Sequence, residues 1–100
     1  MSEQDIQSAV LAAVTAVPGC LAWRANSGLA VTAARSIIRA NVPGCADILA
    51  CYRGRFIAIE VKTERGRQSQ QQRRFQAAVE RAGGLYVLAR SPADALAALA

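Results

Sequence analysis

The stretch from Asp47 to Lys62, DILACYRGRFIAIEVK, decides the fold, because two runs of β-forming residues flank the turn residues Arg53 and Gly54. This pattern predicts a β-hairpin. Successive side chains of a strand point to opposite faces. In the second strand, one face is wholly apolar and belongs in the core: Ile57, Ile59 and Val61. The other face carries Phe56, Ala58, Glu60 and Lys62.

The length of the hairpin loop decides where Asp47 points. With a two-residue loop, Tyr52 pairs with Arg55 and Asp47 lies opposite Glu60. A four-residue loop keeps this register, whereas a three-residue loop turns Asp47 to the other face. Directly opposed residues share a face, with their Cβ atoms about 4.5–5.5 Å apart. The favoured register therefore predicts two carboxylates side by side, with Lys62 next to them.

Two like charges in direct opposition destabilise a sheet, so this pair needs compensation. A hard divalent cation such as Mg²⁺ would supply it, because Mg²⁺ prefers carboxylate oxygens. Two alternatives stay open at this point. Lys62 alone would neutralise the pair, or both acids would splay into solvent at the ends of their strands.

The composition indicates one small basic domain. The chain has 100 residues and a formal net charge of +5. Lys62 is its only lysine, so every other cation is an arginine. A basic domain of this size suits a polyanionic partner, for which nucleic acid is the usual candidate. The alternative is an ordinary basic protein with no such partner.

The chain contains no histidine, which excludes histidine-based catalytic triads and every imidazole base. Acid–base or metal chemistry must therefore use carboxylates. The three cysteines, Cys20, Cys45 and Cys51, form no CxxC pair. This argues against a disulfide scaffold or a zinc site and predicts small core thiols.

The first residues, MSEQD, lack the basic and apolar regions of a signal peptide. No apolar run approaches the length of about 18 residues that a membrane span needs. We therefore expect a cytoplasmic protein.

Periodicity and capping signals predict the remaining elements. We expect a helix over residues 2–17, with a capping box formed by Ser2 and Asp5, and a strand over 20–25. For residues 29–46 the sequence predicts a loop, a short extra strand, or both. A second helix should begin at Ser69, with Gln72 completing its capping box, and end at 83–84. A strand over 85–89 and a helix from Pro92 to Leu99 follow. The fold class is α/β, a small mixed sheet flanked by helices in αβββαβα order.

Several motifs, taken together, match one known family. They are Glu3 in the first helix, RANSG at 24–28, GCAD at 44–47, EVK at 60–62 and GRQSQQQ at 66–72. In this order they resemble the viral-type replication-repair nuclease (VRR-NUC) domain of the PD-(D/E)xK nuclease superfamily. Ala46 replaces the usual proline before the aspartate. The pattern is also similar to that of archaeal-type Holliday junction resolvases, which share the core.

The resemblance implies a restriction-endonuclease-like core and a set of roles. Asp47 and Glu60 would bind Mg²⁺ or Mn²⁺, helped by the Val61 carbonyl, and Glu3 would reach the metal directly or through water. Lys62 would orient or activate the attacking water, a role that suits its compact charge. Gln72 would position Lys62 or the water, or would only complete the capping box.

We predict DNA contacts on both sides of these residues. Arg65, Arg67, Arg73 and Arg74 cluster around Ser69, at a helix N-terminus that can itself receive a phosphate. Arg24, Asn26 and Ser27 form the other candidate segment. The alternatives are a solvated helix face and ordinary turn residues. Trp23 is predicted to lie in the core.

These features predict a metal-dependent endonuclease that hydrolyses DNA phosphodiester bonds, with a preference for branched or junction DNA. The alternatives are a Holliday-junction-resolvase-like member of the same superfamily, a non-catalytic nucleic-acid-binding module, and an interaction domain with an incidental basic surface. Symmetric cutting of a junction needs two sites, so a two-fold homodimer is a further hypothesis.

Overall fold

A computed structural model gives the structure of the chain and describes residues 1–25, 29–31, 37–39 and 42–100. Within residues 26–41 only the backbone of two short strands is described, not the side chains. The elements in chain order are α1 (Glu3–Thr15), β1 (Cys20–Arg24), β2 (Leu29–Val31), β3 (Ile37–Arg39), β4 (Ile48–Tyr52), β5 (Arg55–Val61), α2 (Gln70–Arg81), β6 (Leu85–Ala89) and α3 (Pro92–Leu99).

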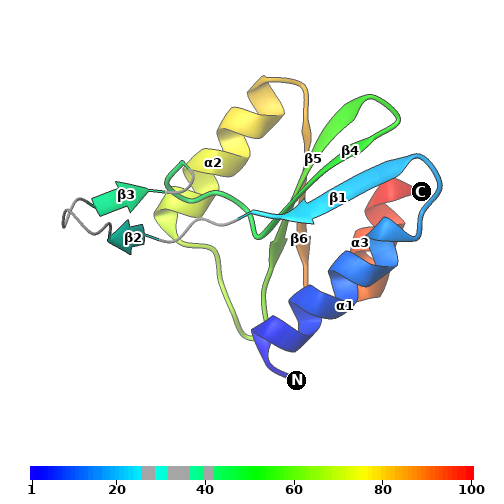
Figure 1. Ribbon diagram of the computed structural model, residues 1–100, viewed down its shortest axis with the longest axis horizontal. Helices are drawn as coiled ribbons and strands as arrows, with labels where there is room; N and C mark the ends of the chain where they lie inside the picture. Colours follow the sequence, from blue (N-terminus) through cyan, green and yellow to red (C-terminus); the bar gives the residue numbers. More distant parts are fainter. Residues whose placement is uncertain (26–28, 32–36, 40–41) are drawn as a thin grey trace.

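The main sheet has four strands in the order β1-β4-β5-β6 (Figure 1). Pairing is antiparallel from β1 through β4 to β5, and parallel between β5 and β6. Helices α1 and α3 pack together on one side of the sheet, whereas α2 lies on the other. The predicted α/β class, mixed sheet and αβββαβα order of the core are confirmed. The ambiguous stretch between β1 and β4 contains an additional antiparallel pair, β2 and β3.

The hairpin has the two-residue loop that the sequence favours. Tyr52 pairs with Arg55, and the ladder continues to Ile48 opposite Ile59. Arg53 and Gly54 have φ angles of 51° and 83°. Both turn residues need positive φ in the loop type that matches the twist of a hairpin, which explains why glycine takes the second position.

The main core lies between the sheet and the pair α1 and α3. Its centre is the face of β5 formed by Ile57, Ile59 and Val61. Each of these residues is at most 1% exposed. From α1, one helical stripe contributes Ile6, Val10 and Val14. The predicted apolar face of β5 therefore packs as expected, and this burial anchors the strand that carries Glu60.

A second, smaller core lies under α2. There Val79 and the partly buried Phe75 pack over Ala58 of β5 and Tyr86 of β6. Among the described elements, no helix covers this face of the sheet at β1, because α2 lies over the β5–β6 side. The prediction that Trp23 lies in the core is therefore wrong, since its side chain is 45% exposed. The prediction of core thiols holds for Cys45, but Cys51 is exposed on this uncovered face.

Local capping signals set the helix starts. Ser2 and Asp5 form a complete capping box at α1, and Ser69 and Gln72 form another at α2. Ser91 caps α3, which has its proline in the first turn as predicted. Among the residues that the structure describes, no helix combines the length and apolar character needed to cross a membrane.

Candidate metal centre

Asp47 and Glu60 come together at the open end of the β4–β5 hairpin. Asp47 directly precedes β4, and its backbone carbonyl accepts a hydrogen bond from the Ala25 amide at 2.9 Å. Its side chain bends toward β5, where Oδ2 accepts a hydrogen bond from the Val61 amide at 2.8 Å. This contact fixes the Asp47 carboxylate beside Glu60, on the same face of the sheet, as the register predicts.

The turn before Asp47 approaches α2 closely. Gly44 has a φ of 76°, and a Cβ atom there would lie 2.2 Å from the Gln71 carbonyl oxygen. Only glycine allows this approach. The glycine of the GCAD motif thus lets the segment carrying Asp47 pack directly against the first turn of α2.

Glu60 is buried, with 1% of its surface exposed, although it belongs to the polar face of β5. Its Oε2 atom accepts a hydrogen bond from Gln72 Nε2 at 3.2 Å and lies 3.7 Å from Lys62 Nζ. Its Oε1 atom is buried without a hydrogen-bond partner among the residues that the structure describes. A buried carboxylate oxygen with no partner carries a large desolvation cost, so it needs an explanation.

The surroundings of Glu60 favour its neutral form. Burial, as the largest cause, and the neighbouring Asp47 carboxylate together raise the pKa of its carboxyl group to about 8. The Lys62 ammonium lowers this pKa but offsets only part of the effect.

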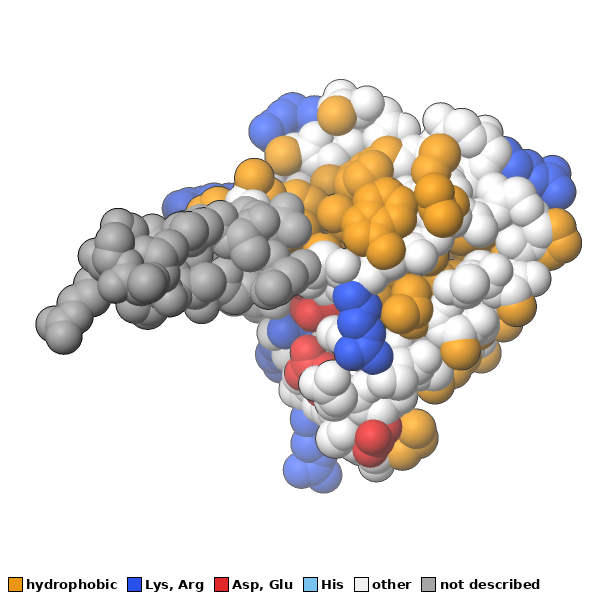
Figure 2. Space-filling model, in the orientation of Figure 1, with side chains coloured by type: hydrophobic (Ala, Val, Ile, Leu, Met, Phe, Trp, Pro, Cys, Tyr) orange, Lys and Arg blue, Asp and Glu red, His pale blue; other side chains and the backbone are white. Residues whose placement is uncertain are grey.

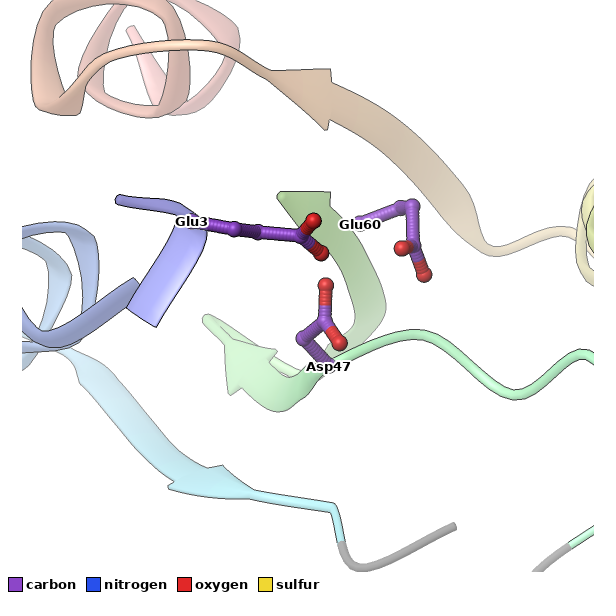
Figure 3. Close-up of side chains that lie close together, drawn as sticks. All are labelled: Glu3, Asp47 and Glu60. Atoms are coloured by element: carbon purple, nitrogen blue, oxygen red, sulfur yellow. The ribbon is translucent and has the colours of Figure 1, made fainter. Parts of the chain in front are cut away.

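Glu3 completes a group of three carboxylates. It lies at the start of α1, and its side chain extends toward Asp47 and Glu60 (Figure 3). One carboxylate oxygen from each residue can be chosen so that all three lie within 4.8 Å of one another. The acids therefore do not splay into solvent. Three converging carboxylates and one unpartnered oxygen form a donor set that fits a hard divalent cation such as Mg²⁺ or Mn²⁺.

Lys62 is held at the edge of this cluster, with 14% of its side chain exposed. Its amide donates to the Ala89 carbonyl at 3.1 Å, which anchors its backbone to β6. A Cβ atom at Gly66 would lie 3.3 Å from both Cβ and Cδ of Lys62, so the following turn packs closely against the stem of the lysine. This packing leaves the ammonium group little freedom to leave the cluster.

Arg90 stabilises the turn that packs on Lys62, a role that no sequence motif indicated. Its Nη1 donates to the carbonyl oxygens of Thr63 at 2.5 Å and Gly66 at 2.8 Å, with a longer contact to Glu64 at 3.2 Å. The residue directly follows β6, and a single arginine after a strand has no signature in the sequence. Only the parallel pairing of β5 and β6 brings it to this turn.

Gln72 completes the capping box of α2, and its side chain also reaches the acidic cluster. Its Oε1 accepts a hydrogen bond from the Ser69 amide at 2.8 Å, which completes the capping box. Its Nε2 donates to Glu60. One side chain thus ties the start of α2 to the acidic cluster, and its partner there is Glu60, not Lys62.

The candidate DNA-contacting residues fall into two groups. Arg65, Arg67 and Arg73 are exposed around the start of α2, and Arg73 donates to the Gln68 carbonyl at 2.9 Å. The Ser69 hydroxyl caps α2 by accepting a hydrogen bond from the backbone amide of Gln72.

The second candidate segment begins at the end of β1. The Arg24 guanidinium donates to Ser8 Oγ of α1 at 2.6 Å. Its strand position pairs with buried Ile48, which places it on the face opposite to that of Asp47. Asn26 and Ser27 lie outside the described residues.

Comparison of the chain with models of protein families, with curated proteins and with solved structures gives no match.

Proposed function

We propose that this protein is a metal-dependent endonuclease that hydrolyses DNA phosphodiester bonds, with a preference for branched DNA. One observation carries the proposal. Glu60 is buried with an unpartnered oxygen, in a cluster with two further carboxylates and directly beside a lysine. Such an arrangement costs folding free energy, and a cation that coordinates the free oxygen would recover it.

The proposed ligands of Mg²⁺ or Mn²⁺ are Asp47, Glu60 and Glu3, together with the Val61 carbonyl. When bound, the ion would polarise the scissile phosphate and lower the pKa of a water molecule that attacks it. The Val61 amide supports this set by holding Asp47 in place. The side-chain amide of Gln72 supports it by holding Oε2 of Glu60, which leaves Oε1 free to bind the ion.

Lys62 would act on the substrate side of the cluster. Its ammonium group lies near Glu60 and is partly exposed, so it can reach a phosphate that approaches from solvent. There it would orient the attacking water and offset negative charge that develops on the phosphate. An arginine would not replace it, because its guanidinium is a rigid planar fork and not a compact point charge.

Exposed arginines around the start of α2 would hold the DNA backbone. Because each phosphate contact releases counterions, binding should weaken as salt concentration rises. Replacing Arg67 and Arg73 together with glutamate should reduce DNA affinity and flatten its salt dependence. Unchanged affinity and salt dependence in this double variant would contradict the role of these arginines.

Cleavage assays with linear and branched DNA test the main proposal. We expect the wild type to cut in Mg²⁺ or Mn²⁺ and to stop when a chelator is added. Glu60→Gln and Lys62→Ala should each reduce the rate by at least about 100-fold, as expected for groups that act on the metal or the reacting phosphate. Glu64→Gln is the matched control, because Glu64 is an exposed acid outside the cluster.

Equal cutting by the wild type and by the variants at Glu60 and Lys62 would refute the proposal. Metal-independent DNA binding without cutting would instead identify a non-catalytic binding module. Symmetric cutting of a junction would also require two copies of the chain, which sedimentation at working concentration can test.

A further inference from the structure

An exposed apolar patch lies on the same face of the sheet as the acidic cluster. Its exposed members are Leu21 and Trp23 of β1, Cys51 of β4 and Phe56 of β5, with Leu49 partly buried between them. The strand pairing places these side chains together, because Leu21 is opposite Cys51, Trp23 is opposite Leu49, and Cys51 is opposite Phe56. Figure 2 shows apolar side chains gathered over this part of the sheet, with acidic side chains just below them.

Trp23 is the member of the patch that comes nearest to the candidate metal centre along the sheet. It pairs with Leu49, and Leu49 lies two residues from Asp47 on the same face. Diagonal neighbours of this kind are about 7–8 Å apart at their backbones. Trp23, which is 45% exposed, therefore lies on the same face of the sheet as Asp47 and one diagonal step away from it.

We infer that Trp23 is a stacking platform for an unpaired base of the DNA next to the scissile phosphate. This inference rests on the proposed function. Aromatic rings stack on bases of any sequence, because every base has a π-face. In a blunt duplex the bases are already stacked on one another, whereas a branch point or a frayed end offers unpaired ones. The platform would thus give the preference for branched DNA a physical basis.

The size of the patch and the net charge of the chain favour nucleic acid over a second copy of the chain. Leu21, Trp23 and Phe56 are 68%, 45% and 42% exposed, respectively. Since a large aromatic side chain covers about 150–250 Å², the patch amounts to roughly a few hundred Å². A stable protein interface needs about 800 Å² on each partner. A net charge of +5 also attracts a polyanion and repels another copy.

Intrinsic fluorescence gives a direct test, because Trp23 is the only tryptophan in the chain. The experiment uses metal-free protein in a chelator, so that no cutting occurs, and a fluorescein-labelled single strand or its blunt duplex. We expect the single strand to quench the emission of Trp23 more strongly than the duplex does. Label anisotropy measures affinity independently of the tryptophan.

Trp23→Ala should raise the Kd for the single strand by about 5- to 150-fold, the range for loss of one stacked base, and the Kd for the duplex by less than about threefold. Trp23→Phe should keep most of the affinity. Leu96→Ala is the control, since it removes an exposed apolar side chain of α3, on the other side of the sheet. Circular dichroism of each variant confirms that it folds.

Three results would overturn the inference. The first is that DNA leaves the Trp23 emission of the wild type unchanged and that Trp23→Ala keeps the wild-type affinity, while the wild type still binds and cuts DNA. This result would leave the proposed function intact. The second is an equal loss of affinity for single strand and duplex. The third is a dimer, detected by sedimentation without DNA, that Trp23→Ala dissociates. If the wild type neither binds nor cuts DNA with Mn²⁺, the proposed function fails as well.

Discussion

Ile59 and Glu60 are neighbours in β5 and are equally buried, with 1% of each exposed, yet their surroundings differ completely. Ile59 lies among aliphatic side chains of α1, α3 and the sheet. Glu60 lies between α2 and the turn that carries Asp47, with one oxygen unpartnered. One strand thus stabilises the fold through one face and carries a reactive group on the other. Burial to the same degree therefore stabilises the fold at Ile59 and costs free energy at Glu60.

The largest expected effect comes from truncation of the apolar face. Ile59→Ala should lower the free energy of unfolding by about 2–5 kcal/mol, because it removes buried methyl groups and leaves a cavity. Glu60→Gln in metal-free protein at pH 8 should cause no such loss, since glutamine has a similar size and removes a buried charge. Urea denaturation measures both. A larger loss in Glu60→Gln than in Ile59→Ala would break the comparison.

The stability of the metal-free protein should depend on pH through Glu60. Its pKa is raised to about 8 in the folded state, above the value of 4.5 expected for the unfolded chain. Between these values the folded state binds the extra proton, so stability is greatest below about pH 5 and falls as pH rises toward 8. The loss should be on the order of 3 kcal/mol. The contribution of Glu60 is the difference between the pH dependence of the unfolding free energy in wild type and that in Glu60→Gln. This difference should vanish if the pKa of Glu60 is ordinary.

Metal binding should reverse this loss at high pH. At a Mn²⁺ concentration about 100 times the Kd, the folded state should gain about 2.7 kcal/mol, because the ion binds it in preference to the unfolded chain. The gain should appear as a higher Tm in wild type and in Glu64→Gln, but not in Glu60→Gln. Equal shifts in all three proteins would show that the ion binds elsewhere.

The smallest effect is expected at the link between α2 and the cluster. Gln72→Ala should cost about 1 kcal/mol of stability, since it removes half of a capping box. It should also lower the rate of metal-dependent cutting by about 10-fold, because Glu60 loses the donor that orients it. Gln71→Ala, at an exposed neighbouring position, is the control. A stability loss without any change in cutting would limit Gln72 to its capping function.

The parts of the molecule that depend on neighbouring residues could be predicted from the sequence. Alternation along β5 sorted Ile59 and Glu60 onto different faces, and the Arg53–Gly54 turn set the register that brings Asp47 beside Glu60. The serine caps located the helix starts. These features are predictable because strand period, turn type and capping each involve only a few adjacent residues.

Other features came only from the tertiary structure. The sequence did not reveal that Glu60 is fully buried with a free oxygen, that Arg90 holds the turn after Lys62, or that Trp23 is exposed. Each depends on where a distant element packs: α2 covers Glu60 but stops short of β1, and the pairing of β5 with β6 brings in Arg90. The chemical groups of the site are thus encoded locally, whereas their burial, and with it the raised pKa of Glu60, follows from how the layers cover the sheet.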